Sequence, residues 1–290
     1  MISRRCLLSY AWSAPLLAAD LVPRSRVSFI TDEVARSPHD AIRFAKRFGL
    51  TSVELRQVPG TKRGYWDLTE AEQTEALREL ADSGLQVSFV DSGLLACPIP
   101  GTTPVRTPGP KEAERFTNRM EDLRRVVAFA QRAQASKVRC FTFRRVADPM
   151  SLFPQIAGLI VPMAEYAAKE GVQLLVENES SCNMNTCAEI TGLMKLLPAR
   201  VPLNWDPGNA SNQERAFPDG YKLLPVRRIA NVQLKGKSLL GAGDGTDWPG
   251  IVRALVADGY RGHFALETHT PERVTDSVPA MERLLRIVAG

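Results

Sequence analysis

The sequence has few of the residues that build the commonest metal and redox sites. Its 290 residues include three histidines and five cysteines, and no Cys-x-x-Cys. The cysteines are scattered, at Cys6, Cys97, Cys140, Cys182 and Cys187, so they predict neither a zinc ribbon nor a disulfide framework. Cys182 and Cys187 share a polar loop. Pairing after export is one interpretation, and small unpaired loop residues are the favoured one.

A cluster of basic residues and a glycine-rich nucleotide signature are also missing. Lys and Arg number 37 against 32 Asp and Glu, a net charge of +5, and the basic residues are spread along the chain. This pattern argues against nucleic-acid binding, which needs Lys and Arg gathered on one face. No G-x-G-x-x-G follows the first predicted strand, which disfavours a doubly wound sheet without excluding it.

The N-terminus differs from the rest of the chain. Arg4 and Arg5 precede an uncharged stretch that ends before Asp20, a pattern typical of a secretory signal. Together with Ser3, the two arginines resemble a twin-arginine export signal. The stretch is too short to cross a bilayer, so we expect no stable membrane insertion. We favour export to the periplasm, and the alternative is an N-terminal arm on a cytoplasmic protein.

Residues 26–290 alternate between apolar β-rich runs and helical patterns, whereas residues 1–25 form the expected signal or arm. A helix over residues 38–48 shows apolar spacing of i, i+3, i+4 and i+7. The proline-rich segment 97–114 is predicted as an elaborated loop. The expected strands cover residues 26–31, 51–56, 85–90, 137–143, 172–177, 201–206, 229–235 and 263–269. Eight βα units predict a single-domain α/β protein, a (β/α)8 TIM barrel.

Polar side chains end every expected strand, and the carboxyl ends of barrel strands form the face where active sites lie. Glu177, Asp206 and Glu267 end three of these strands. Carboxylates gathered this way must be neutralised by a divalent cation, by basic side chains or by protonation. Basic residues at other strand ends could form a salt-bridged rim instead: Arg56, Arg144 and Lys235. We favour a metal ion.

Several motifs resemble those of a known family. VENE is followed by CNMNT, then WDPGNA, the glycine-rich GAGDGTDW and ALETH, while TDEV and VELR accompany the first two strands. From about Val27 to the C-terminus, this order is similar to the sugar phosphate isomerase/epimerase family, the xylose-isomerase-like TIM barrels. The resemblance implies a divalent metal held at the ends of four strands. Carried over by motif, the ligands are Glu177, Asp206, Gln233 and Glu267.

Strand seven departs from the family pattern. Where the family usually has H-V-H-x-K-D, this chain reads N-V-Q-L-K-G, so both histidines are replaced and only the lysine, Lys235, remains. A Gln carbonyl oxygen suits Mn²⁺ or Mg²⁺ better than Zn²⁺, so Mn or Mg is the expected cofactor. A weakened or lost metal site is the alternative. Three histidines also argue against the multi-zinc cluster of the family's endonuclease branch.

The resemblance implies an isomerase or epimerase of a sugar or keto-sugar, acting by proton abstraction through an enediolate. Glu177 and Glu267 would move the proton, and Asp206 would be a ligand only. Candidate substrate contacts, each with a rim salt bridge or a cap as the alternative, are Arg56, Arg144, Glu179, Asn209, Lys235 and His269.

Two other functions stay open. An inosose-type dehydratase would use the same metal and the same proton abstraction on a polyol. A sugar-binding envelope protein with weakened catalysis is favoured by Gln233 and Gly236, and the retained carboxylates argue against it. In each case the partner is a small sugar or polyol rather than nucleic acid. Homo-oligomerisation is left open.

Overall fold

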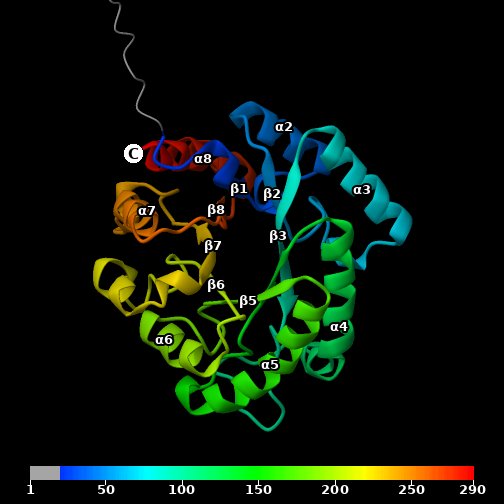
Figure 1. Cartoon of the computed structure of the whole chain (residues 1–290), viewed down its shortest axis with the longest axis vertical. Helices are drawn as coiled ribbons and strands as arrows, with labels where there is room; N and C mark the ends of the chain where they lie inside the picture. The colour runs from blue at the N-terminus through cyan, green and yellow to red at the C-terminus, as the bar shows by residue number, and fades with distance from the viewer. Residues whose placement is uncertain (1–19) are drawn as a thin grey trace, which may run out of the picture.

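The strands of the chain are short apolar runs, and each pairs in parallel with the next one along the sequence. The computed structural model describes residues 20–290, so Cys6 and most of the expected export signal lie outside the described residues. The eight strands are β1 (Val27–Phe29), β2 (Ser52–Leu55), β3 (Gln86–Leu94), β4 (Lys137–Cys140), β5 (Gln173–Glu177), β6 (Leu203–Trp205), β7 (Ile229–Leu234) and β8 (Phe264–Leu266). Strand β8 returns to pair with β1, and β1 meets β2 through a bridge between Ile30 and Glu54. The predicted single-domain TIM barrel is therefore confirmed, with a nearly closed sheet (Figure 1).

Helices cover the outside of the sheet (Figure 1). Their bounds are α1 (Thr31–Val34), α2 (Pro38–Phe48), α3 (Glu70–Asp82), α4 (Glu112–Arg132), α5 (Phe153–Lys169), α6 (Cys187–Leu196), α7 (Trp248–Ala257) and α8 (Arg273–Ala289). The predicted bounds of α2 are correct, because Ser37 caps its start and Gly49, with a φ of 63°, ends it. None of the helices in residues 20–290 is long and apolar enough to span a membrane.

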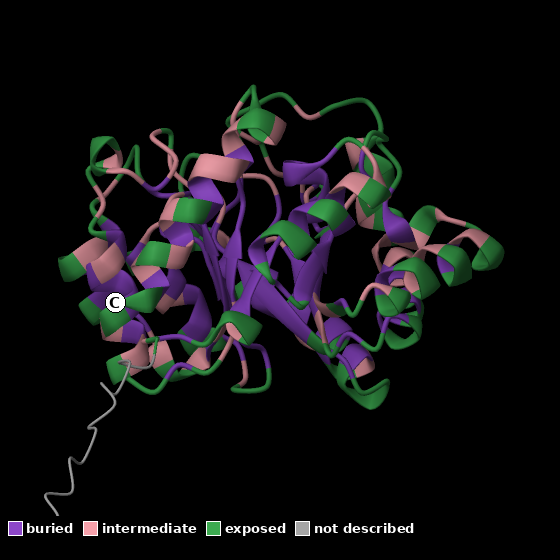
Figure 2. Cartoon of the chain, turned by 90° about the horizontal axis from the view of Figure 1, so that it is seen from above, coloured by how far each residue is buried: buried purple, intermediate pink, exposed green. Residues whose placement is uncertain are grey.

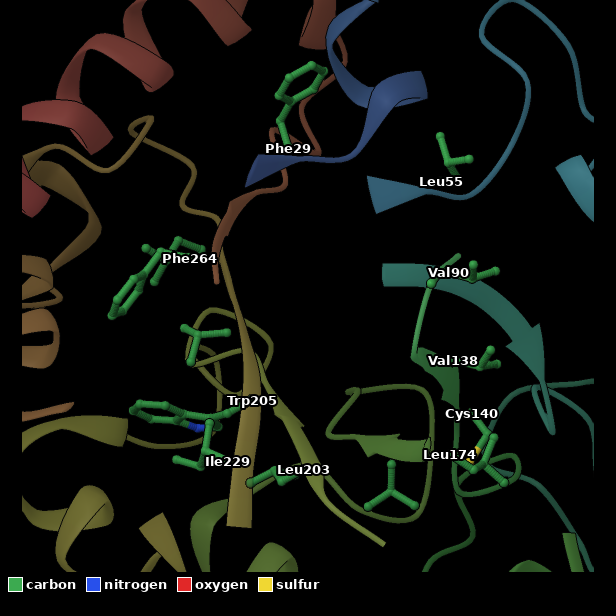
Figure 3. Packing of buried hydrophobic residues seen from close by; sticks show 14 of the residues in the cluster. Phe29, Leu55, Val90, Val138, Cys140, Leu174, Leu203, Trp205, Ile229 and Phe264 are labelled. Carbon is green, nitrogen blue, oxygen red and sulfur yellow. The ribbon is translucent and has the colours of Figure 1, made fainter. Parts of the chain in front are cut away.

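The hydrophobic core lies between the strands and the helices. Phe29, Leu55, Val138, Trp205 and Phe264 are buried and point from their strands away from the barrel interior (Figure 3). The strands are mostly buried, apart from a few residues of β3, β4, β5 and β7, whereas exposed residues cover the outer helix faces and the loops (Figure 2). Side chains on a strand alternate between its two faces. The residues between these apolar ones therefore face the inside of the barrel.

The inside of the barrel is polar. Barrels of this kind are usually filled with branched apolar side chains, but here Glu54, Asn204, Asn231 and Gln233 are completely buried. The Asn231 amide donates to Glu54 (2.9 Å) and to Asn204 (3.1 Å). The Gln233 amide donates to Glu54 (2.8 Å) and to Asp91 (2.7 Å). Buried polar groups are tolerated when they are hydrogen-bonded, so this network sets the orientation of each member.

Two further predictions concern the loops and the cysteines. The proline-rich segment predicted as an elaborated loop connects β3 to α4. The cysteines in residues 20–290 are free and buried: Cys97, Cys140, Cys182 and Cys187. Cys182 and Cys187 are thus unpaired, as favoured, although they are buried rather than exposed in a polar loop.

We expect the Asn204→Ala substitution to lower the free energy of unfolding by about 2–4 kcal/mol, because it leaves several buried polar groups without partners. Asn204 donates to Glu177 (2.5 Å) and Gln233 (2.9 Å) and accepts from Asn231. Urea denaturation measures the effect. The matched control is Asn118→Ala on the exposed face of α4, expected within about 0.5 kcal/mol of wild type. Equal stabilities of the two variants would contradict a structural role for the network.

Candidate active site

Three carboxylates lie buried at the carboxyl ends of the strands. Glu177 is the last residue of β5, Asp206 follows β6 and Glu267 follows β8. Their exposed fractions are 1%, 0% and 3%. Burying a carboxylate costs several kcal/mol unless a partner compensates it. The cationic partners of these three groups therefore define the site.

Lys235 joins two of the carboxylates. Its Nζ lies 3.0 Å from Asp206 Oδ2 and 2.9 Å from Glu267 Oε2. The other oxygen of Asp206 accepts from the backbone N–H groups of Gly208 (2.7 Å) and Asn209 (3.2 Å). A Cβ at Gly208 would lie 2.4 Å from the carbonyl oxygen of Lys235, so glycine permits the close approach of these two segments.

Arg139, on β4, is the cation beside Glu177. Its guanidinium donates to Glu177 Oε2 (3.0 Å) and lies 3.4 Å from Asp91 Oδ1. Arg139 was not among the site residues predicted from the sequence. An arginine in the middle of an apolar strand was the signal that could have found it, because such a side chain needs a buried partner. Asn209, a predicted substrate contact, also donates to Glu177 Oε1, at 3.4 Å.

Arg56 contacts three carboxylates near the ends of β1 and β8. It donates to Asp32 (2.8 Å), to Glu33 and to Glu267 (3.3 Å). The backbone N–H of His269 donates to Glu33 (2.8 Å). Glu33, Glu267 and His269 each offer a ligand atom within 4.8 Å of the others, so this group could hold a metal ion. Of the four predicted ligands, only Glu267 belongs to it.

Gln233 is oriented by the barrel interior. Its amide nitrogen faces Glu54 and Asp91, and its oxygen accepts from Asn204 (2.9 Å). The atom predicted to bind a metal is therefore already hydrogen-bonded within the protein.

Burial and nearby charges separate the acidities of the carboxylates. Burial raises the pKa of Glu177 to about 7, although Arg139 opposes the shift. Burial also raises the pKa of Asp206 to about 7, against the effect of Lys235. Burial acts the same way on Glu267, but Lys235 and Arg56 outweigh it and hold that pKa well below its usual value. One site thus contains a carboxyl whose pKa is raised, Glu177, and one whose pKa is lowered, Glu267. This is the arrangement expected of an acid and a base.

Two cavities are lined by the cations that pair with these carboxylates, while the three carboxylates themselves line neither cavity. One, of about 710 Å³, is lined by residues from several loops, among them Glu179, Asn209, Lys235, Trp248 and His269. The other, of about 480 Å³, includes Arg56, Asp91 and Arg139 in its lining. Arg144 lines neither cavity and pairs instead with Glu112 at the start of α4 (2.7 Å). The structure therefore gathers the predicted substrate contacts at the barrel's open end, except Arg144.

Comparison with known families identifies the chain. The model of the xylose isomerase-like TIM barrel family matches residues 42–287. The chain belongs to this family. A search of curated proteins gives no match.

Solved structures share the fold at low sequence identity. D-Psicose 3-epimerase from Clostridium cellulolyticum H10, determined with D-tagatose, superposes with a TM-score of 0.68 at 12% identity, covering 91% of this chain and 99% of that one. The 3-keto-D-glucoside 4-epimerase of E. coli gives 0.68 at 13% identity, covering 90% and 98%. A family protein from Mycobacterium smegmatis in complex with magnesium gives 0.61 at 16% identity, covering 86% and 87%.

The four implied ligands do not fit a divalent ion as they are arranged in this chain. Lys235 lies against the Asp206 and Glu267 oxygens that would bind it. Arg139 and Asn204 contact Glu177 Oε2, and the Gln233 oxygen accepts from Asn204. A free ligand set would present lone pairs to a common point. Here oxygens of Glu177, Glu267 and Gln233 accept from protein donors, and Asp206 Oδ2 has the ammonium of Lys235 at 3.0 Å.

We expect the Tm of the Glu177→Gln variant, relative to that of wild type, to be higher at pH 8 than at pH 5. The raised pKa means that the folded carboxyl keeps a proton between about pH 4.5 and 7 that the unfolded chain releases. The stability that wild type gains from keeping this proton is therefore lost as the pH rises through this window. The variant has no such proton and loses nothing. Thermal unfolding at both pH values measures the difference in Tm between variant and wild type.

The control for this measurement is Glu165→Gln, at a half-exposed position on α5. Its Tm difference from wild type should stay nearly constant between pH 5 and pH 8. A Glu177→Gln difference that falls toward high pH would contradict the raised pKa.

Proposed function

We propose that this protein is an isomerase or epimerase of a sugar or keto-sugar, working by proton transfer at the carbon beside a carbonyl. The observation that carries the proposal is the pair of buried carboxylates at the strand ends, Glu177 beside Arg139 and Glu267 beside Lys235, whose pKa values are shifted in opposite directions. The sugar epimerases that share the fold support the same reaction class.

In the proposed reaction the ionised Glu267 removes the proton from the carbon next to the carbonyl. The C–H electron pair forms the double bond of an enediolate, and the carbonyl electron pair moves to oxygen. Glu177 holds its own proton near neutral pH and donates it to the same carbon from the other face. This gives the epimer. Donation to the former carbonyl carbon gives the isomer, after a proton moves between the two enediolate oxygens. Exchange with solvent then resets both carboxyls.

The substrate's polar groups would be bound in the larger cavity. Glu179, Asn209 and His269 line it and offer both acceptors and donors to sugar hydroxyls. Trp248, in the same lining, gives an apolar surface suited to the C–H face of a sugar. The resemblance implies a divalent metal ion. Glu33, Glu267 and His269 offer ligand atoms close together, and Arg56 donates to both of these carboxylates. We assign no step of the reaction to the ion.

Deuterium incorporation tests the proposal. Incubation in D₂O with a panel of ketoses and keto-sugars should place one deuterium on the carbon beside the carbonyl of at least one of them, detected by NMR together with the epimer or isomer. Glu177→Gln and Glu267→Gln should each lower the rate by at least about 100-fold, because each removes one proton-transfer group.

Glu165→Gln is the control and should retain wild-type rates. Loss of water from a polyol with formation of a keto product would point to a dehydratase instead. Binding of sugars without any exchange, in a folded protein, would contradict an enzymatic function.

Export is a separate proposal, carried by Arg4, Arg5 and the uncharged stretch after them. N-terminal sequencing of the protein from its native cell fractions tests it. A periplasmic chain that begins after about residue 20 supports cleavage and export. A chain that keeps Met1 in the cytoplasm contradicts them.

A further inference from the structure

The site already contains positive charge at the place where the family resemblance implies a metal ion. Lys235 Nζ contacts one oxygen of Asp206 at 3.0 Å and one of Glu267 at 2.9 Å. These carboxylates are almost completely buried, so Lys235 is partly removed from water together with them. A divalent ion binding the same two oxygens would lie directly beside an ammonium group and be repelled by it.

The other two implied ligands have protein partners as well. Arg139 and Asn204 both donate to the same oxygen of Glu177, at 3.0 Å and 2.5 Å. Gln233 contributes to the hydrogen-bond network inside the barrel through its nitrogen and its oxygen. Freeing these oxygens for an ion would leave the buried Asn204 amide without an acceptor, which is costly. It would also remove the Glu177 partner of Arg139, which keeps its hydrogen bonds to the backbone oxygens of Ser92 and Asp91.

We propose that Lys235 is the built-in cation of this site and stands in place of a divalent metal ion between Asp206 and Glu267. An ammonium group has three N–H donors. One donates to Glu267 Oε2, the ammonium also lies 3.0 Å from Asp206 Oδ2, and a further N–H is available to the cavity of about 710 Å³ that Lys235 lines. If the proposed isomerase function holds, this donor stabilises the enediolate oxygen, where charge develops during proton abstraction.

Titration with Mn²⁺ alone tests the proposal without any substrate. Isothermal titration calorimetry is carried out on the whole protein, and the quantity compared is the Mn²⁺ binding that depends on Asp206. Each protein is titrated with and without the additional Asp206→Asn substitution, and the difference between the two titrations is the Asp206-dependent binding. An ion held by Glu33, Glu267 and His269 binds in both titrations and is not counted. Wild type should have no Asp206-dependent binding.

Variants of Lys235 give the positive result. Lys235→Met removes the charge and keeps the apolar stem, and it should gain one Asp206-dependent Mn²⁺ per chain, at least about 100-fold tighter than any in wild type. Lys235→Gln is a second neutral variant, so the test does not depend on the folding of one protein. Lys235→Arg keeps a cation, and Lys237→Met removes an exposed lysine two residues away. Both should behave as wild type.

The Gln233→His variant distinguishes this proposal from a simpler explanation, namely that the site differs only because it lacks the family's histidine. If the missing histidine alone explains the altered site, Gln233→His should bind Mn²⁺ while Lys235 is present. Our proposal predicts that it does not, and that Gln233→His combined with Lys235→Met binds most tightly of all. Asp206-dependent binding to wild type, binding restored by Gln233→His alone, or no gain in either neutral Lys235 variant would overturn the proposal.

These outcomes do not depend on the reaction. Mn²⁺ binding to wild type would remove the role of Lys235 but leave the isomerase function standing. Absence of deuterium exchange with every sugar would remove the isomerase function but leave the assignment of the cation intact.

Discussion

The site depends on how the barrel compensates buried negative charge. Glu177, Asp206 and Glu267 lie within a few per cent of complete burial, where an unpaired carboxylate is strongly unfavourable. The chain compensates them with three cations from nearby strands, Arg139 on β4, Lys235 after β7 and Arg56 after β2. The positions of these cations determine which carboxylate oxygens remain open to a ligand.

The same requirement extends into the barrel interior. Gln233, Asn204 and Asn231 form a hydrogen-bonded layer beneath the carboxylates, which connects Glu177 on β5 with Glu54 on β2. Hydrogen bonds in such a buried network orient its members, although Asn231 Oδ1 and Asp91 Oδ2 have no hydrogen-bond partner among residues 20–290. The carboxylate pair proposed for proton transfer is therefore linked to side chains inside the barrel, and its geometry is coupled to the stability of the barrel.

The fold was predictable from the sequence because it depends on local patterns. Alternating apolar runs and helical periodicity located the eight βα units, and Ser37 and Gly49 mark the ends of α2. The positions of the carboxylates followed from the same reasoning, since the ends of parallel strands must meet on one face.

The partners of these residues could not be predicted in the same way. Strand periodicity indicates that Gln233 faces inward, but not that its amide will bind Glu54 from the other side of the barrel. Arg144 was expected to follow a strand over residues 137–143, but β4 ends at Cys140, and the partner of Arg144 is Glu112, at the start of α4. Such pairings depend on distances between elements, which a single sequence does not specify.

The role of Lys235 is tested most directly by a crystal structure of the protein soaked in Mn²⁺, with anomalous scattering used to locate the ion. The account predicts Lys235 Nζ about 3 Å from both Asp206 and Glu267, with no anomalous peak between them. A peak about 2.0–2.3 Å from oxygens of Asp206 and Glu267, with Lys235 displaced from them, would contradict it.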